Sequence, residues 1–111
     1  MTISTHVLDT ARGRPAPGLG VTLSRRGADG EWSVVVDAVT DDDGRVRELA
    51  KGPTEPGDYR LAFATAAYFK AAGTGGFYPE VSVVFSVTDA GADHHVPLLL
   101  SPFGYSTYKG T

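Results

Sequence analysis

Short runs of β-branched, aromatic and other apolar residues recur along the chain, and clusters of glycine, proline and aspartate separate them. Short strands joined by tight turns at fairly even spacing are typical of a β-sandwich. The segments expected to form strands are 3–8, 21–25, 32–39, 45–49, 59–64, 81–87 and 95–100. The pattern therefore predicts an all-β domain made of two packed sheets.

One segment departs from this strand pattern. Residues 65–72 read TAAYFKAA and are rich in alanine, which has the highest helix propensity. Gly73 follows directly, and a glycine just past the last turn commonly ends a helix. We expect one short helix here, within a single domain that spans residues 1–111, because a chain of this length has the size of one domain.

Three histidines lie in or next to two of the expected strands. Side chains alternate between the two faces of a strand, so His6 shares a face with Ser4. His94 and His95 are neighbours and must point to opposite faces, with His95 on the face of Pro97. At most one of these two can therefore share a site with His6. A single histidine on a strand is more often structural than functional, although its ordinary pKa suits proton transfer near pH 7.

The composition narrows the chemistry that such histidines can perform. The chain has no cysteine, asparagine or glutamine, which excludes disulfides, thiolate catalysis and recognition by side-chain amides. A catalytic zinc site needs three converging ligands, and the adjacent positions of His94 and His95 oppose such a site, so a metal is not expected. The net charge of -3 and the lack of lysine and arginine runs give no indication of a nucleic-acid or membrane partner.

Arg45 opens an expected strand directly after the aspartate-rich turn 41–44. It is either a solvated arginine, which the sequence alone favours, or a planar cation that clamps an anionic substrate. The turn itself lacks the ligand spacing of a calcium loop. The chain has no Gly-x-Ser-x-Gly elbow to support a serine hydrolase. The first residues lack the basic start and apolar run of a secretory leader, so a cytoplasmic location is expected.

The last expected strand, 95–100, is almost wholly apolar and contains Pro97. Proline cannot donate a hydrogen bond to a sheet ladder, so Pro97 predicts a strand at a sheet edge or an irregular position. An apolar strand at an edge invites association unless another subunit covers it. The segment therefore predicts an oligomer.

The sequence from His95 to Thr111, HVPLLLSPFGYSTYKGT, resembles the C-terminal signature of the 5-hydroxyisourate hydrolases, which are also called transthyretin-related proteins. That family ends in Tyr-Arg-Gly-Ser where this chain ends in Tyr-Lys-Gly-Thr. Further matches are STHVLD at 4–9, TDDDGR at 40–45, GDYR at 57–60, YF at 68–69 and FYPE at 77–80. The resemblance extends over essentially the whole chain.

The resemblance implies a transthyretin-like β-sandwich of seven to eight strands with one short α-helix. It also implies a homotetramer, built as a dimer of dimers, with active sites at the dimer-dimer interface. The implied reaction is hydrolysis of the cyclic amide 5-hydroxyisourate to 2-oxo-4-hydroxy-4-carboxy-5-ureidoimidazoline in urate degradation, a step of purine metabolism that needs no cofactor. The family's catalytic residues map onto His6, Arg45 and His95 of this sequence.

The C-terminal tetrapeptide of the family lines the active site, so Tyr108, Lys109 and Thr111 are expected to bind substrate. Lys109 keeps the charge of the family arginine but loses its two-pronged geometry, and Thr111 keeps the hydroxyl of the family serine.

Transthyretin shares the fold of this family but carries thyroid hormone, and it lacks the histidine pair and the Tyr-Arg-Gly-Ser ending. His6, Arg45 and His95 therefore favour an enzyme over the alternative, a small-molecule carrier without catalysis. In the expected mechanism one histidine acts as general base toward water, and Arg45 stabilises charge on the attacked carbonyl. The choice between His6 and His95 as the base stays open.

Overall fold

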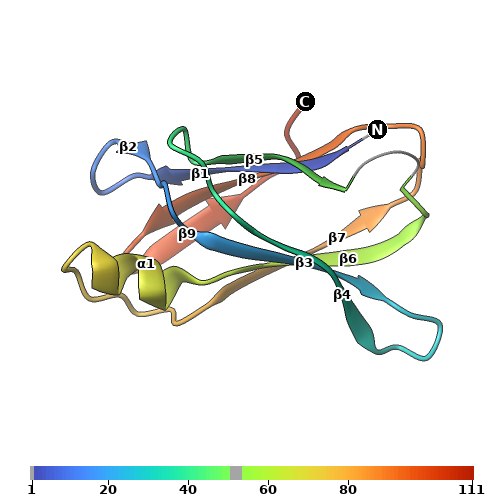
Figure 1. The fold of residues 1–111 in the computed structure, drawn as a ribbon, viewed down its shortest axis with the longest axis horizontal. Coiled ribbons are helices and arrows are strands. Elements are labelled where there is room, and N and C mark those ends of the chain that lie inside the picture. The colour runs from blue at the N-terminus through green and yellow to red at the C-terminus, as the bar shows by residue number, and fades with distance from the viewer. Residues whose placement is uncertain (1, 51–53) are drawn as a thin grey trace.

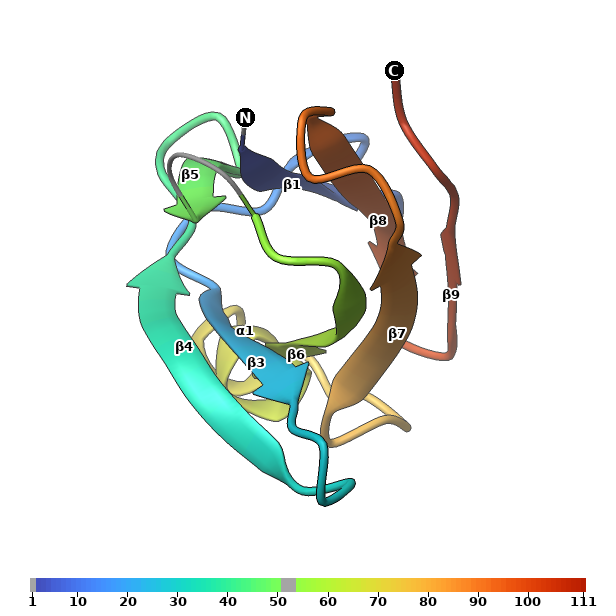
Figure 2. The ribbon, with the colours of Figure 1, turned by 90° about the vertical axis from the view of Figure 1, so that its right-hand side faces the viewer.

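The computed structural model describes residues 2–50 and 54–111. Its strands form two sheets that face each other, as Figure 1 and Figure 2 show. The first sheet contains β1 (Ile3–Asp9), β2 (Arg14–Pro15), β5 (Arg45–Ala50), β8 (His94–Ser101) and β9 (Gly104–Thr107). The second sheet contains β3 (Gly20–Arg26), β4 (Trp32–Val39), β6 (Gly57–Phe63) and β7 (Val81–Val87). The predicted β-sandwich is confirmed.

Strand β1 lies inside the first sheet. On one side it pairs in parallel with β8, and on the other side it pairs antiparallel with β5 and, at its end, with β2. On its far side, β8 pairs antiparallel with β9. The second sheet has the order β4-β3-β6-β7 and is antiparallel. On one side of the sandwich the two sheets therefore end in β7 and β9 (Figure 2).

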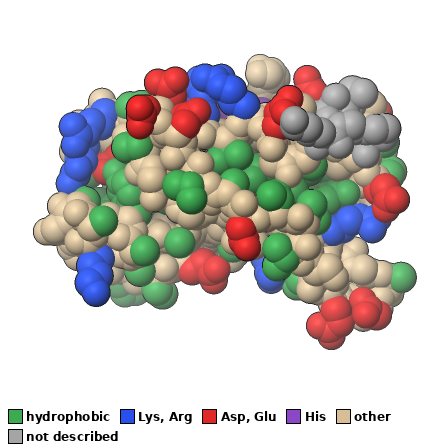
Figure 3. Space-filling view, viewed as in Figure 1, with side chains coloured by type: hydrophobic (Ala, Val, Ile, Leu, Met, Phe, Trp, Pro, Cys, Tyr) green, Lys and Arg blue, Asp and Glu red, His purple; other side chains and the backbone are tan. Residues whose placement is uncertain are grey.

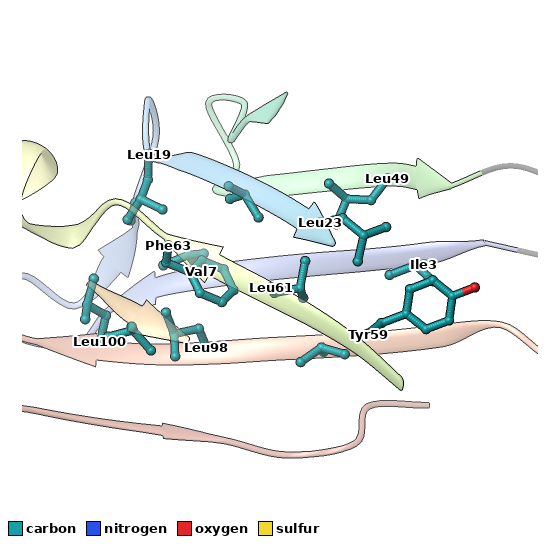
Figure 4. Packing of buried hydrophobic residues seen from close by; sticks show 14 of the residues in the cluster. Ile3, Val7, Leu19, Leu23, Leu49, Tyr59, Leu61, Phe63, Leu98 and Leu100 are labelled. Carbon is teal, nitrogen blue, oxygen red and sulfur yellow. The ribbon is translucent and has the colours of Figure 1, made fainter. Parts of the chain in front are cut away.

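Strand alternation places the hydrophobic core between the two sheets (Figure 4). On β1, Ile3 and Val7 are fully buried, and they pack in one cluster with Leu61 and Phe63 of β6. Full burial of such a side chain contributes roughly 1.5–3 kcal/mol. The buried residues also fix the register of β1, because a slip of one residue would carry His6 into the core.

The helix α1 (Thr65–Ala71) follows β6 and occupies the predicted segment. Gly73 has a φ of 72°, the left-handed conformation in which a glycine ends a helix. The Tyr68 hydroxyl donates a hydrogen bond of 2.7 Å to the Asp9 carboxylate and so ties the helix to the end of β1. Burial and this hydrogen bond raise the pKa of Tyr68 to about 12. No helix of the described segments is long and apolar enough to cross a membrane.

Each predicted strand is present, in most cases with one or two additional residues. Two strands were not predicted: the two-residue β2, and β9, which follows a tight turn after β8. If β2 is set aside, residues 2–50 and 54–111 form eight strands, as the resemblance implied.

Pro97 does not lie at a sheet edge, and that part of the prediction was wrong, because β8 has β1 on one side and β9 on the other. The alternative, an irregular position, is what the structure shows. The β8–β9 ladder covers residues 98–101, is interrupted at Pro97 and resumes in a single bridge between His95 and Gly110. At this break the Thr107 hydroxyl donates a hydrogen bond of 2.7 Å to the Pro97 carbonyl. Since neighbours flank β8 on both sides, this strand by itself gives no reason for an oligomer.

Candidate active site

Two pairings of β1 bring candidate residues to one face of the first sheet. In the parallel pair with β8, Ser4 lies opposite His95. In the antiparallel pair with β5, His6 lies opposite Arg45. Side chains of directly opposite residues point to the same face of a sheet. The structure thus confirms that Ser4 and His6 share a face, and it places His95 and Arg45 on the same outer surface.

His94 points the other way. It is 9% exposed and lies on the face of β8 that carries the buried residues Val96 and Leu98. Its Nδ1 atom has no hydrogen-bond partner within the described residues. The side chain of His94 therefore points to the face opposite that of His95, as strand alternation predicted, although both residues border a cavity between β7 and the strands β8 and β9.

The hydrogen bond of His6 determines which of its nitrogens is free. Nε2 of His6 lies 2.9 Å from the backbone carbonyl oxygen of Asp43. A carbonyl can only accept a hydrogen bond, so Nε2 carries the proton in this contact. Nδ1 is therefore the nitrogen of His6 that remains for a substrate.

The aspartate-rich turn before β5 positions both Asp43 and Arg45. The Asp41 carboxylate accepts hydrogen bonds from the backbone amides of Asp43, at 2.9 Å, and Arg45, at 3.0 Å. The bond from Arg45 is the main cause that lowers the pKa of the Asp41 carboxyl. Gly44 has a φ of 74°, and a Cβ atom there would clash with the carbonyl oxygen of Val7. Only glycine lets this turn close against β1.

The imidazole of His95 is held on two sides. Nδ1 lies 2.8 Å from the Ser4 hydroxyl oxygen. On another side lies Gly110, where an added Cβ atom would be only 2.6 Å from Cδ2 of the ring. Burial lowers the pKa of His95, and the charge of Arg45 and the neighbouring His6 lower it further. This shift favours the neutral form of His95, which is the state that can accept a proton.

A cavity of about 360 Å³, which we call the Arg45 cavity, is lined by residues that include Ser4, Arg45, His95, Gly110 and Thr111. His6 lies on the same face of the sheet but is not part of this lining. Figure 3 shows acidic and basic side chains close together along the upper edge of the molecule, where β1 and β5 lie in Figure 1. A guanidinium group and a neutral imidazole beside a small cavity can bind a polar molecule, stabilise developing negative charge and move a proton.

Residues of the C-terminal tail line two different cavities. Thr111 lines the Arg45 cavity. Tyr108 and Lys109 line a second cavity of about 370 Å³ between β7 and the strands β8 and β9, which we call the Lys109 cavity. His95 borders both cavities. The structure therefore brings Thr111 to Arg45 and His95, whereas Tyr108 and Lys109 approach His95 from the Lys109 cavity.

Sequence reasoning did not single out Ser4 or Gly110, although both contact His95. The available signal for Ser4 was its position two residues before His6, which places both side chains on one face. For Gly110 the only signal was its place in the tail motif. Among residues 2–50 and 54–111, no three histidine, aspartate or glutamate side chains are grouped as metal ligands would be.

Comparison with known proteins gives consistent matches. A model of the HIUase/Transthyretin family matches residues 3–110. The 5-hydroxyisourate hydrolase of Mus musculus is 46% identical over 111 residues, which cover 98% of this chain and 94% of the mouse protein. The 5-hydroxyisourate hydrolase of Caulobacter vibrioides is 44% identical over 114 residues, which cover 98% of this chain and 97% of the bacterial protein.

Solved structures of two functional kinds share the fold. The 5-hydroxyisourate hydrolase of Klebsiella pneumoniae has a TM-score of 0.88 and 35% identity, with 100% of both chains covered. Sea bream transthyretin in complex with thyroxine has a TM-score of 0.92 and 32% identity, with 100% of this chain and 96% of that chain covered. The fold alone therefore does not distinguish catalysis from hormone binding.

Proposed function

The chain belongs to the HIUase/transthyretin family, and we propose that it hydrolyses 5-hydroxyisourate with His6, Arg45 and His95 as its catalytic residues. The observation that carries this proposal is that two imidazoles and one guanidinium lie on one face of the first sheet, where His95 and Arg45 line the Arg45 cavity. Relatives that are 42% to 46% identical over nearly the whole chain are hydrolases of this substrate by name. The chain is therefore an enzyme, and the carrier alternative takes second place.

His95 acts as the general base in this proposal. Since Nδ1 contacts Ser4, Nε2 is the nitrogen that takes a proton from the attacking water. The water oxygen bonds to the carbonyl carbon of the cyclic amide, and a tetrahedral intermediate forms. As the C–N bond breaks, the proton on Nε2 passes to the leaving nitrogen. The two hydrogens and the oxygen of one water are thus divided between the new carboxyl group and the released N–H.

Arg45 stabilises charge and His6 orients the substrate. Negative charge develops on the carbonyl oxygen when water adds to it, and a fixed guanidinium beside the cavity stabilises that charge. His6 lies opposite Arg45 in the β1–β5 pair, with Nε2 engaged by Asp43. Its free Nδ1 accepts a hydrogen bond from an N–H of the substrate ring. This division of roles needs no cofactor.

The tail supplies further contacts to the substrate. Thr111 makes a direct contact in this proposal, which its place in the lining of the Arg45 cavity supports. Tyr108 and Lys109 border His95 from the Lys109 cavity, so we assign them binding contacts from that side. The ammonium group of Lys109 adds positive charge near the base without the paired hydrogen bonds of an arginine.

The proposed assembly is a homotetramer that forms as a dimer of dimers. Strands β7 and β9 have no partner on their outer edges within the described chain. Near these edges Val84 is 54% exposed, Phe77 is 70% exposed and Phe103 is 78% exposed. Free strand edges beside exposed apolar side chains favour association. A second copy paired along this side would cover them, and a second dimer on the outer face of the first sheet would enclose the Arg45 cavity.

The proposed activity is tested with freshly generated 5-hydroxyisourate and purified protein. The ultraviolet signal of the substrate should decay faster than its spontaneous rate, in proportion to protein concentration. A sample in which both His6 and His95 are replaced by alanine serves as the control. Decay at the spontaneous rate, together with tight binding of the unreacted ligand, would instead identify a carrier.

A further inference from the structure

The register of the first sheet fixes Ser4 beside His95. The two residues are directly opposite each other in the parallel β1–β8 pair, and Ser4 is half-buried. Their side chains meet at 2.8 Å between the hydroxyl oxygen and Nδ1. The Ser4 hydroxyl has no other hydrogen-bond partner among the described residues. The hydroxyl group therefore forms its hydrogen bond with this imidazole and not with another group of the sheet.

Gly110 restricts the same ring from another side. Its backbone amide donates a hydrogen bond of 2.8 Å to the carbonyl of His95. The space next to Cδ2 of the imidazole is so narrow that a Cβ atom on Gly110 would lie 2.6 Å from it. If the ring turned over, Cδ2 would replace Nδ1 in front of Ser4 and the hydrogen bond would be lost. The ring is thus held in one orientation.

We propose that Ser4 is a positioning residue that holds His95 through Nδ1, so that Nε2 is the nitrogen presented to the attacking water. The inference rests on the proposed role of His95 as general base. For Nε2 to have a free lone pair in the neutral ring, Nδ1 must carry the proton and donate it to the Ser4 oxygen. A hydroxyl can accept this bond, and the proton on Nδ1 stays in place throughout the reaction.

The use of a hydroxyl rather than a carboxylate has a chemical consequence. A carboxylate at this position would favour the imidazolium and raise the pKa of His95. Serine orients the ring without adding a negative charge. The causes that lower the pKa of His95, which are burial first and then the neighbouring Arg45 and His6, therefore keep their effect and favour the neutral ring that can accept a proton.

The experiment compares Ser4→Ala, which removes the hydroxyl, with Ser4→Thr, which keeps it. Ser33→Ala is the matched control, because Ser33 is an exposed strand serine of the other sheet. We expect Ser4→Ala to lower kcat roughly tenfold, which corresponds to about 1.4 kcal/mol of transition-state stabilisation, with little change in KM. Ser4→Thr should recover most of kcat, and the melting temperatures of the variants should stay close to that of the parent chain.

Nitrogen-15 spectra of the imidazole of His95 supply a readout that is independent of turnover. The parent chain should show a protonated Nδ1 in the neutral ring, and Ser4→Ala should show a mixture of tautomers. An unchanged tautomer in Ser4→Ala, or a protonated Nε2 in the parent chain, would overturn the proposal. A rise in KM alone, or a covalent adduct on Ser4, would also overturn it, since Ser4 would then contact substrate. If His95→Ala keeps full activity, the proposed function of His95 fails instead, whatever the spectra show.

Discussion

The three histidines of this chain show how one residue type acquires different properties from its position. His6 has one nitrogen bonded to a carbonyl, His95 has one nitrogen bonded to a hydroxyl, and His94 has a buried Nδ1 that has no partner among the described residues. Only His6 and His95 lie on the outer face of the first sheet. The environment of each ring, rather than its presence in the sequence, indicates its role.

Single alanine substitutions test this division. His6→Ala and His95→Ala should each lower kcat/KM by roughly 100-fold or more, the scale of general acid-base catalysis. His94→Ala should change kcat/KM much less and instead lower the melting temperature, because it leaves a space on the buried face of β8. Steady-state kinetics and melting curves on the three variants provide the check. Equal losses of activity from His94→Ala and His95→Ala would contradict the site.

The pH dependence of the enzyme should reflect the lowered pKa of His95. The base must be neutral, so kcat/KM rises with pH through that pKa, and the acid limb should lie below pH 6.5, the ordinary value of histidine. Arg45→Gln removes a charge that disfavours the imidazolium, so the pKa of His95 should rise and the limb should move to higher pH. Arg45→Lys keeps the charge and is the control, with the limb unmoved. An identical limb in Arg45→Gln would show that His95 is not the titrating base.

Among the structural elements, the turn before β5 positions two groups of the site. It presents the carbonyl of Asp43 to His6 and places Arg45 at the start of β5. Gly44→Ala should therefore lower both stability and activity, because the φ of 74° costs a side chain about 1–2 kcal/mol and the Cβ atom meets β1. Gly13→Ala is a matched control, since Gly13 has a φ of 70° and open space around its Cβ position.

Unfolding curves and kcat measured on both glycine variants separate the two effects. Gly13→Ala should lose stability from backbone strain while its kcat stays near that of the parent chain. Gly44→Ala should lose stability and kcat together. Equal kcat values in the two variants would mean that the turn does not set the position of Arg45.

The C-terminal tail is a second element with a specific role. Deletion of residues 108–111 removes the contact with His95 and the Thr111 side of the Arg45 cavity. Activity should therefore fall far more than the melting temperature, because chain ends normally contribute little to a fold. The comparison needs kcat/KM and melting curves of the shortened and the parent chain at the same protein concentration. A shortened chain with full activity would remove Tyr108, Lys109 and Thr111 from the site.

The elements that were predictable from sequence are those whose signal is local. Alternation gave the faces of His6 and His95, and an alanine-rich segment before Gly73 gave the helix. The neighbours of β8 were not predictable, because strand pairing depends on contacts between distant segments and not on the composition of one strand. The contacts of Ser4 and Gly110 with His95 were missed for the same reason, since each depends on the pairing partner of β8.

At the scale of the whole molecule, the tetramer is the main expectation. Light scattering at micromolar concentration should give a mass near four times 11.7 kDa. Phe77→Glu and Val84→Glu place charges near the free edges β7 and β9, and they should shift the mass toward smaller species. Activity is measured on the same fractions. A monomer with full activity would contradict the proposal that assembly encloses the Arg45 cavity.

The parallel pairing of β1 with β8 also has a consequence for how the chain folds. Ser4 and His95 are 91 positions apart, so their contact closes a very long loop. Such loops are entropically costly to close, and folds dominated by distant pairings form slowly. Until β8 joins, β1 lacks its parallel neighbour, and His95 remains far from His6 and Arg45. During refolding, recovery of turnover should therefore follow strand formation elsewhere in the chain. The return of enzymatic activity then reports when β8 pairs with β1.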